Sequence, residues 1–337
     1  MNPAGAGPSP ATIYDVAREA GVHPSTVSRA FSRPGRVSSQ TSARVHEVAA
    51  RLGYRQDVPF RLPNRSRSQV ICLVVSDITN PYYLGIIRGA EQAAAAADLS
   101  LVVTDGRESA AHERRVLRRN LPGSDGFIIT SSRLSDNELR ALAREVPLVV
   151  VNRRVPGLPC VHPDNARGIR RSVEHLASLG HTTLGYVAGP SASWADGARW
   201  RAVREACHEL MLTDVRIGPV APTIPGGRAA AQEIVRSGLT AVQTYNDMVG
   251  VGVLRGLAGL GVDVPGEVSV VGFDNTLPAD LVTPGLTTVA QPVMVLGETA
   301  ARAVIAQVAG EATPRQLTQV VPVRLVERAS TGPVRTG

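Results

Sequence analysis

The chain has few cysteines and no long apolar run, and each shortage excludes a class of protein. Three cysteines in 337 residues, Cys72, Cys160 and Cys207, are odd in number and widely spaced, which argues against a disulfide framework and suits a reducing compartment. No apolar run approaches the roughly 20 residues that a membrane span requires. The first ten residues contain neither a basic nor an apolar segment, so no signal peptide is predicted. We therefore expect a cytoplasmic protein without a membrane partner.

Motifs for metals, cofactors and catalysis are also missing. The seven histidines are scattered, and no His/Cys spacing resembles a zinc site. The sequence GLAGLG closes a predicted helix instead of opening one after a strand, so it indicates a turn and not a phosphate loop. No nucleophile-elbow sequence is present. We predict no metal, no cofactor and no catalytic residues.

Positive charge is concentrated at the start of the chain. Residues 1–69 contain ten arginines and four acidic residues, a net charge of +6. Residues 70–337 contain 26 arginines and 25 acidic residues, a net charge of +1. A compact basic segment before a nearly neutral domain is typical of nucleic-acid binding, and a solvated basic face without a partner is the alternative.

Residues 12–31, TIYDVAREAGVHPSTVSRAF, predict two short helices joined by a tight turn at Gly21, with Pro24 in the first turn of the second helix. The apolar positions of these two helices are Ile13, Val16, Ala17, Val27, Ala30 and Phe31. A third amphipathic helix begins with Ser38 or Ser39 as its N-cap. Its inward-facing residues are Val45, Val48, Ala49 and Leu52. The pattern predicts a helix-turn-helix, whose second helix can enter a DNA major groove.

The rest of the chain predicts an α/β domain. Its apolar, strand-like runs are QVICLVVSD, LSLVVTDG, GFIIT, PLVVVNR, TLGYVAG, AVQTYN and VSVVGFDN. They alternate with helical stretches, which is typical of parallel sheets covered on both faces. The pattern repeats before and after His162, so we expect two doubly wound subdomains with a cleft between them.

Seven motifs in order make the sequence resemble the LacI/GalR family of transcription regulators. They are TIYDVAREAGVHPSTVSRAF, RVHEVAARLGY, PDNARG, LASLGHTTLGYVAGP, YNDMVGVGVLRGL, VPGEVSVVGFDN and LTTVAQP. The resemblance implies a type I periplasmic-binding-protein-like fold whose chain crosses between lobes near His162, Gln291 and Val321. The expected organisation is a disordered tail (1–10), the helix-turn-helix domain (11–57), a hinge (58–69), the effector domain (70–330) and a tail (331–337). Lobe 1 is expected over 70–161 and 291–320, and lobe 2 over 162–290 and 321–330.

The DNA contacts follow from the helix-turn-helix and from the resemblance. Pro24, Ser25 and Arg29 match the specificity positions of the family, and Arg29 can contact guanine through two hydrogen bonds. The phosphate contacts expected to set the register are Thr12, Tyr14, Ser28, Ser32 and Thr41. The complete set of predicted DNA-binding residues is Thr12, Tyr14, His23, Pro24, Ser25, Ser28, Arg29, Ser32, Arg36, Thr41, Arg61 and Leu62.

The hinge departs from the pattern of the family. Relatives have a short hinge helix here that inserts leucines into the minor groove, but the usual leucine position holds Pro63, four residues after Pro59. Pro63 would lack an amide donor and clash with the preceding turn, so at most about one helical turn is expected. Any apolar wedge would then come from Leu62 or Phe60. A flexible basic tether is the alternative.

In open α/β sheets, ligands bind beyond the carboxyl ends of the strands. The polar residues at those ends are Asp77, Asn80, Asp105, Ser131, Ser132, Arg153, Trp194, Arg199, Asn246, Asp247 and Asp274. Carboxylates and amides can bridge neighbouring hydroxyls, arginine offers several donors, and an indole can cover a sugar ring. In the proteins that the sequence resembles, the positions of Arg199, Asn246, Asp247 and Asp274 often contact the effector.

Each of these residues also has a purely structural interpretation. Asn246 is a good helix N-cap, and Asp77 with Asn80 can shape the turn before Pro81. Trp194 can pack between lobes, and Arg199 can form a surface ion pair. Many relatives have aspartate where this chain has Asn152, which leaves the identity of the effector open.

The sequence thus predicts a DNA-binding transcription regulator, a repressor. We expect it to bind a palindromic operator as a homodimer and to respond to a small effector, a sugar or sugar derivative. A transport-type sugar receptor would share the bilobed domain but would have no use for residues 12–54. An enzyme on the same fold is the second alternative.

Overall fold

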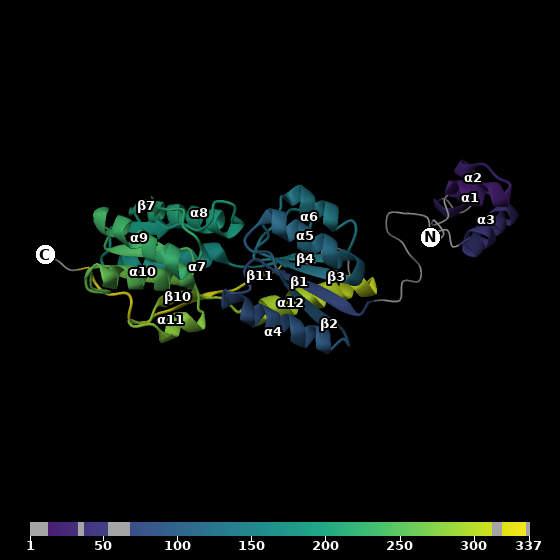
Figure 1. The fold of residues 1–337 in the computed structure, drawn as a ribbon. Helices are drawn as coiled ribbons and strands as arrows, with labels where there is room; N and C mark the ends of the chain where they lie inside the picture. The colour runs from purple at the N-terminus through teal and green to yellow at the C-terminus, as the bar shows by residue number, and fades with distance from the viewer. Residues whose placement is uncertain (1–12, 33–36, 53–67, 312–318, 335–337) are drawn as a thin grey trace, which may run out of the picture. The chain divides into compact units, whose positions relative to one another are not determined.

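The computed structural model describes residues 13–32, 37–52, 68–311 and 319–334. The chain divides into two compact units, residues 1–65 and residues 66–337, and each is described here by itself (Figure 1). No helix in the described ranges is both long and apolar enough to cross a membrane.

The first unit is a three-helix domain. Its helices are α1 (Ile13–Ala20), α2 (Pro24–Ser32) and α3 (Ser39–Leu52). Gly21 takes φ +66°, a left-handed conformation that costs glycine little, and so ends α1. The core contains Val16, Ala17, Ala20, Val27, Ala30, Val45, Val48 and Ala49. Ser38 is the N-cap of α3, because its hydroxyl accepts the amide of Thr41 at 3.2 Å.

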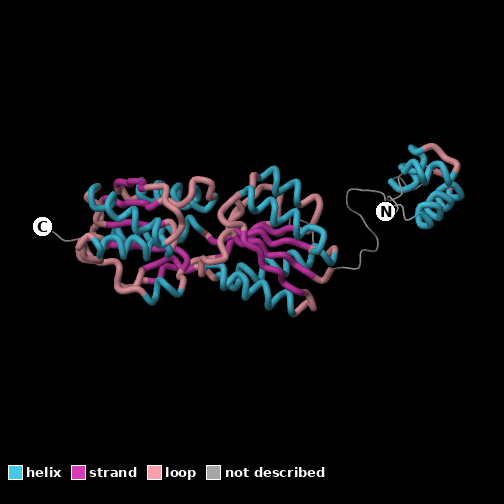
Figure 2. Tube along the Cα trace, in the orientation of Figure 1, coloured by secondary structure: helices cyan, strands magenta, loops and turns pink. Residues whose placement is uncertain are grey.

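The second unit contains two lobes, each built on a six-stranded sheet that helices cover on both faces (Figures 1 and 2). In lobe 1 the order is β11-β5-β4-β3-β1-β2, and every pair is parallel. Its strands are β1 (Val70–Val75), β2 (Ser100–Asp105), β3 (Gly126–Thr130), β4 (Leu148–Val151), β5 (Cys160–Pro163) and β11 (Gln319–Val321). Its helices are α4 (Tyr82–Ala95), α5 (Ala110–Asn120), the 3-10 helix η1 (Leu121–Gly123), α6 (Asp136–Leu142) and α12 (Val293–Ala309).

Lobe 2 repeats this arrangement. Its strand order is β12-β10-β9-β8-β6-β7, and β12 alone among these strands pairs antiparallel. Its strands are β6 (Thr183–Val187), β7 (Thr213–Ile217), β8 (Ala241–Thr244), β9 (Ser269–Asp274), β10 (Thr287–Ala290) and β12 (Arg324–Val326). Its helices are α7 (Asn165–Ser178), α8 (Trp194–Glu209), α9 (Ile224–Arg236), α10 (Asp247–Gly259) and α11 (Leu277–Leu281). The predicted fold class, a helix-turn-helix domain followed by two doubly wound parallel sheets, is confirmed.

The chain passes between the lobes three times, after β5, after β10 and after β11. The second crossing returns α12 to lobe 1, where it lies beside α4 (Figure 1). Gly89 and Gly297 permit this close approach. A Cβ on Gly89 would lie 2.0 Å from the carbonyl oxygen of Met294, and one on Gly297 would lie 2.0 Å from that of Ile86. Helices from distant parts of the sequence thus complete one lobe.

Residues 331–334 differ from the tail expected there. The amide of Val334 donates to the carbonyl of Leu179 at 2.9 Å, and the amide of Gly332 donates to the Ser269 hydroxyl at 3.0 Å. His181, buried below them, contacts the carbonyl oxygen of Gly332 at 3.2 Å. The effector domain therefore extends to Val334, because these backbone groups find partners on lobe 2.

Candidate DNA-recognition surface and effector pocket

The second helix of the first unit carries the predicted base-reading residues. His23 precedes α2, and its Nδ1 accepts the amide of Ser25 at 3.3 Å, so it acts as a helix cap. Ser25 and Arg29 are exposed, while Pro24 is half-buried. No acidic residue in the described ranges forms an ion pair with Arg29, whereas Arg18 pairs with Asp15.

Of the other predicted DNA contacts, some lie in the described part of the chain and the rest lie outside it. Tyr14 is 66% exposed on α1, and Thr41 is half-buried in the first turn of α3. Ser28 and Ser32 belong to α2. Thr12, Arg36, Arg61 and Leu62, with the Pro59/Pro63 hinge, lie outside the described residues.

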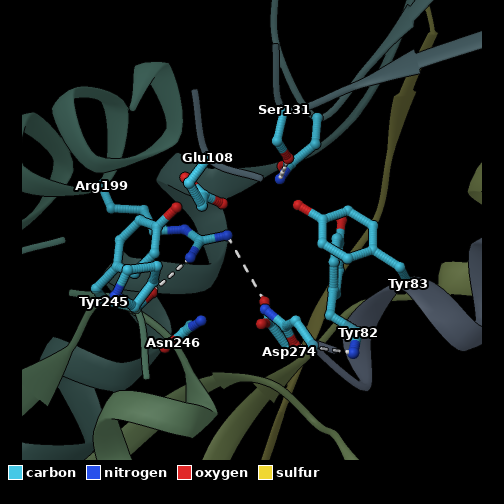
Figure 3. Close-up of a pocket in the computed structure, with 11 residues that line it drawn as sticks. Tyr82, Tyr83, Glu108, Ser131, Arg199, Tyr245, Asn246 and Asp274 are labelled. Atoms are coloured by element: carbon cyan, nitrogen blue, oxygen red, sulfur yellow. Dashed lines mark hydrogen bonds and ion pairs between the residues drawn. The ribbon is translucent and has the colours of Figure 1, made fainter. Parts of the chain in front are cut away.

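A pocket lies between the two lobes (Figure 3). Lobe 1 contributes Asn80, Tyr82, Tyr83, Glu108, Ser131 and Asn152 to its walls. Lobe 2 contributes Arg199, Pro222, Tyr245, Asn246 and Asp274. The free space between these side chains is about 20 Å³, room for about one water molecule, so the walls must move apart before a larger ligand can enter.

Arg199 and Asp274 form the charged part of the lobe 2 wall. Both side chains are nearly fully buried, yet Nη2 of Arg199 and Oδ1 of Asp274 are 3.8 Å apart, beyond hydrogen-bond distance (Figure 3). Arg199 is held from behind by Asn165, whose Oδ1 accepts Nε at 3.0 Å, and by the carbonyl of Tyr245. Its guanidinium also lies 3.7 Å above the centroid of the Phe273 ring. The arginine is therefore fixed in place while Nη2 faces the carboxylate across a gap.

Asp274 is unusual in conformation and in protonation. It ends β9 with φ 125°, a region that non-glycine residues rarely adopt. Burial raises the pKa of its carboxyl well above the usual range; Arg199 opposes this shift, and Asp247 adds to it. Such strained and perturbed groups cluster at functional sites.

A chain of hydrogen bonds joins the lobes beneath the pocket. The Tyr82 hydroxyl of α4 donates to Oε1 of Gln291 at 3.1 Å, and Nε2 of Gln291 donates to Asp274 at 2.6 Å. Gln291 directly follows β10, in the crossover between lobes. Asp274 is thus linked to lobe 1 through one buried amide.

The lobe 1 wall contains a buried acceptor without a partner. Nδ2 of Asn152 donates to the Ser131 hydroxyl at 2.9 Å, but its Oδ1 has no hydrogen-bond partner among the described residues. Ser131 and Asn152 follow β3 and β4 with positive φ values of 47° and 59°. Leaving a buried acceptor unsatisfied costs about 1–3 kcal/mol, so a ligand donor at this point would gain affinity.

Glu108 belongs to a second ion pair, in lobe 1. Nε of Arg133 donates to its Oε2 at 2.9 Å, and Nη2 donates to the same oxygen. The Arg133 side chain is 4% exposed. The charge of Glu108 is therefore neutralised before any ligand binds.

Comparisons with known proteins agree with this arrangement. A model of bacterial regulatory proteins of the lacI family matches residues 12–57, and one of the periplasmic binding protein-like domain matches residues 173–331. The HTH-type transcriptional regulator DegA of Bacillus subtilis is 30% identical over 337 residues, which cover 96% of this chain and 99% of DegA. The chain belongs to the lacI family. The regulator GalR of Escherichia coli is also 30% identical and covers 95% of each chain.

Solved structures of transcription regulators share this architecture over most or nearly all of the chain. The complex of the transcriptional regulator CelR with cellobiose superposes with a TM-score of 0.72 at 29% identity, covering 95% of this chain and 99% of CelR. The lac repressor dimer bound to operator and the anti-inducer ONPF gives 0.71 at 27% identity, covering 96% and 100%. A lacI-family regulator from Enterococcus faecium with bound ribose gives 0.69 at 29% identity, covering 79% and 100%. As a member of this family, the protein is a DNA-binding transcription regulator and not an enzyme.

Five of the eleven predicted strand-end residues meet in the pocket of this lacI-family protein. They are Asn80, Ser131, Arg199, Asn246 and Asp274. Asn246 also caps α10, since its Oδ1 accepts the amide of Val249 at 3.0 Å, so the structural and binding interpretations coexist. Arg199 is buried instead of forming a surface ion pair.

The remaining predicted residues lie near the pocket but do not line it. Asp77 and Asp105 accept hydrogen bonds from loop amides, those of Thr79 and Arg107, both at 2.9 Å. Arg153 donates to the carbonyls of Ser132 and Leu134 and to Asp136. Ser132 donates to the buried Glu113. Trp194 begins α8 with its ring 6.0 Å from that of His162, and Asp247 is buried behind the sheet edge. Strand-end position locates a residue near the site but does not set the direction of its side chain.

Sequence reasoning missed several lining residues. These are Tyr82, Tyr83, Glu108, Pro222 and Tyr245, and Asn152 was noted only as a departure from relatives. Tyr245 directly follows β8, so the strand-end rule applied to aromatic residues would have found it. The other four lie in loops or at the start of α4, where local sequence carries no such signal.

Proposed function

We propose that the protein is a repressor that binds a palindromic operator as a homodimer and responds to an uncharged sugar bound between its lobes. The observation that carries the effector class is the charge balance of the pocket. Each ionisable residue in its walls, Arg199, Asp274 or Glu108, faces an ionisable partner that can carry the opposite charge. A neutral polyol is favoured, because it can bridge these groups without adding a buried net charge.

The pocket lining and the relatives support a sugar. Tyrosines 82, 83 and 245 line the pocket and can cover the apolar faces of a polyhydroxylated ligand. CelR was solved with cellobiose, and the Enterococcus faecium regulator with ribose.

The homodimer is supported by the likeness to the lac repressor dimer bound to operator. One helix-turn-helix reads only a half-site, and a two-fold symmetric protein matches a palindrome.

The DNA proposal is tested by selecting and sequencing the DNA that the purified chain binds. Two symmetric half-sites are expected, and the complex should have the mass of two chains. Arg29→Ala should abolish preference among half-site variants, a loss of roughly 1–3 kcal/mol, and keep salt-sensitive nonspecific binding. Arg44→Ala, an exposed arginine on α3, is the matched control and should keep the preference. Unchanged preference in Arg29→Ala would refute its role in base reading.

The effector proposal is tested by calorimetry of the wild-type chain against a panel that includes D-ribose, cellobiose and their phosphorylated forms. Binding of a neutral sugar and release of the selected DNA are expected. Selective binding of a phosphorylated sugar would contradict the charge argument.

A further inference from the structure

The turn after β9 holds two consecutive residues at positive φ, Asp274 at 125° and Asn275 at 62°. A φ of 125° is a value that L-residues adopt only where surrounding contacts hold them, whereas φ 62° is the left-handed conformation that asparagine adopts more readily than most residues. The contacts that hold this turn converge on one buried carboxylate, that of Asp247, the first residue of α10.

Asp247 is fully buried and bonds to the residues that follow Asp274. Its Oδ2 accepts the amide of Thr276 at 2.6 Å and the Thr276 hydroxyl at 3.0 Å. Its Oδ1 accepts the Thr288 hydroxyl at 2.5 Å, and that hydroxyl oxygen accepts the amide of Asn275 at 3.3 Å. The two amides after Asp274 are thus held by one carboxylate, one directly and one through Thr288.

The strand leaves space for this carboxylate. A Cβ on Gly272, two residues before Asp274, would lie 2.3 Å from Oδ1 of Asp247. Glycine at this position lets the carboxylate lie against the strand that carries the pocket residue. Asp247 itself does not line the pocket.

We infer that Asp247 is a positioning residue, which holds the turn that directs the Asp274 carboxylate toward Arg199 and does not itself contact the effector. This inference rests on the function proposed above. It differs from the sequence-based expectation, in which Asp247 contacts the effector.

The electrostatics of Asp247 and Asp274 agree with the close contact between Asp247 and the turn. Burial raises the pKa of Asp247 to about 6, and the charge of Asp247 in turn contributes to the raised pKa of Asp274. The other ionisable groups that face the pair are Arg199 and Tyr82 near Asp274 and Arg328 near Asp247.

The first experiment needs no effector. Carboxyl-carbon NMR of the full chain, labelled at aspartate, follows the titration of Asp274 in the wild type and in Asp247→Asn. Asp247→Asn should lower the pKa of Asp274, because a neighbouring negative charge is removed. Asp214→Asn, on the far edge strand β7, is the matched control and should change nothing. An unchanged Asp274 titration in Asp247→Asn would overturn the inference.

The second experiment measures the turn itself. In Asp247→Ala, hydrogen exchange at the amides of Asn275 and Thr276 should be at least about tenfold faster, since their acceptor network is lost. Amides of strand β6 should keep their wild-type rates, which shows that the lobe remains folded. Wild-type exchange at both turn amides would contradict the proposed contact.

The third experiment uses D-ribose and cellobiose as calorimetric probes. Asp247→Ala should weaken whichever sugar the wild type binds by about tenfold or more, a loss of at least ~1.4 kcal/mol. Wild-type affinity combined with faster exchange would overturn the positioning role. If the wild type binds neither sugar, the proposed effector class loses support, while the NMR and exchange results still decide the role of Asp247.

Discussion

Two ion pairs face the same pocket from opposite lobes, and they differ in the distance between their charged groups. In lobe 1, Arg133 and Glu108 are hydrogen-bonded at 2.9 Å, and the pair is satisfied without a ligand. In lobe 2, Arg199 and Asp274 are 3.8 Å apart, although other contacts hold each of them firmly. Lobe 2 therefore has charged groups that a ligand can bridge, whereas the charges of lobe 1 mainly stabilise its own wall.

The largest effect on sugar affinity should come from changing the Arg199–Asp274 pair of lobe 2. Asp274→Ala should weaken the sugar found by the screen at least about 100-fold, because it leaves Arg199 and the ligand hydroxyls without their acceptor. The free energy of unfolding should fall less than for a fully formed buried pair, because Arg199 keeps its contacts with Asn165 and the carbonyl of Tyr245 and because burial already disfavours the charged form of Asp274. Calorimetry and urea unfolding measure the two quantities. Near wild-type affinity would remove Asp274 from the site.

The Arg133–Glu108 pair of lobe 1 should respond in the opposite way, with an effect on stability and little effect on sugar affinity. Glu108→Gln should lower the free energy of unfolding by about 2 kcal/mol, because Arg133 is left buried without its charged partner. That figure is below the roughly 3–5 kcal/mol of fully buried pairs, since the Glu108 side chain is 26% exposed. Sugar affinity should stay within about threefold of the wild type. A large loss of affinity without loss of stability would show that Glu108 binds the effector directly.

The sequence predicted the fold class because long buried strands and their intervening helices leave a clear pattern. The strand β1, VICLVV, is buried along nearly its whole length and was predicted from its continuous apolar run. The edge strand β7, TDVRI, was missed because one of its sides faces solvent and its sequence alternates. β11 and β12 are three residues each, too short for any period to show.

The site was only partly predictable, for a physical reason. Asp274 and Arg199 were predicted because the carboxyl ends of strands converge at one edge of a sheet. The direction of each side chain depends on contacts distant in sequence, such as those of Asp247 with Thr276 and Thr288. The wall of lobe 1 comes largely from loop residues such as Glu108, whose position depends on Arg133.

Asn152 provides a test of whether the lobe 1 wall contributes to sugar affinity. Its free Oδ1 is an acceptor in the lobe 1 wall, so an uncharged group there contributes to binding even if Glu108 does not. Asn152→Ala should weaken sugar binding about tenfold. The free energy of unfolding should fall by about 1–2 kcal/mol, because the hydrogen bond from Nδ2 to Ser131 is lost and alanine adopts φ 59° less readily than asparagine. Calorimetry and urea unfolding measure both. Asn137→Ala, an exposed asparagine on α6, is the control. Equal affinities of all three proteins would confine binding to lobe 2.

The smallest expected effect is on the pH dependence of stability, and it comes from the buried carboxylate of Asp247. The pKa of Asp247 rises from 3.8 to about 6 on folding, so the folded state binds its proton more tightly and this contribution to stability is lost as pH rises from about 4 to 6. Between pH 4.5 and 5.5 the loss should be about 1 kcal/mol per pH unit. Asp247→Asn lacks the titrating group, so its stability relative to the wild type should increase by that amount over this range. Urea unfolding followed by tryptophan fluorescence measures it, because Trp194 and Trp200 both lie on α8 of lobe 2. Parallel pH profiles of the wild type and Asp247→Asn would mean that Asp247 has an ordinary pKa, and the charge coupling between Asp247 and Asp274 would then be absent.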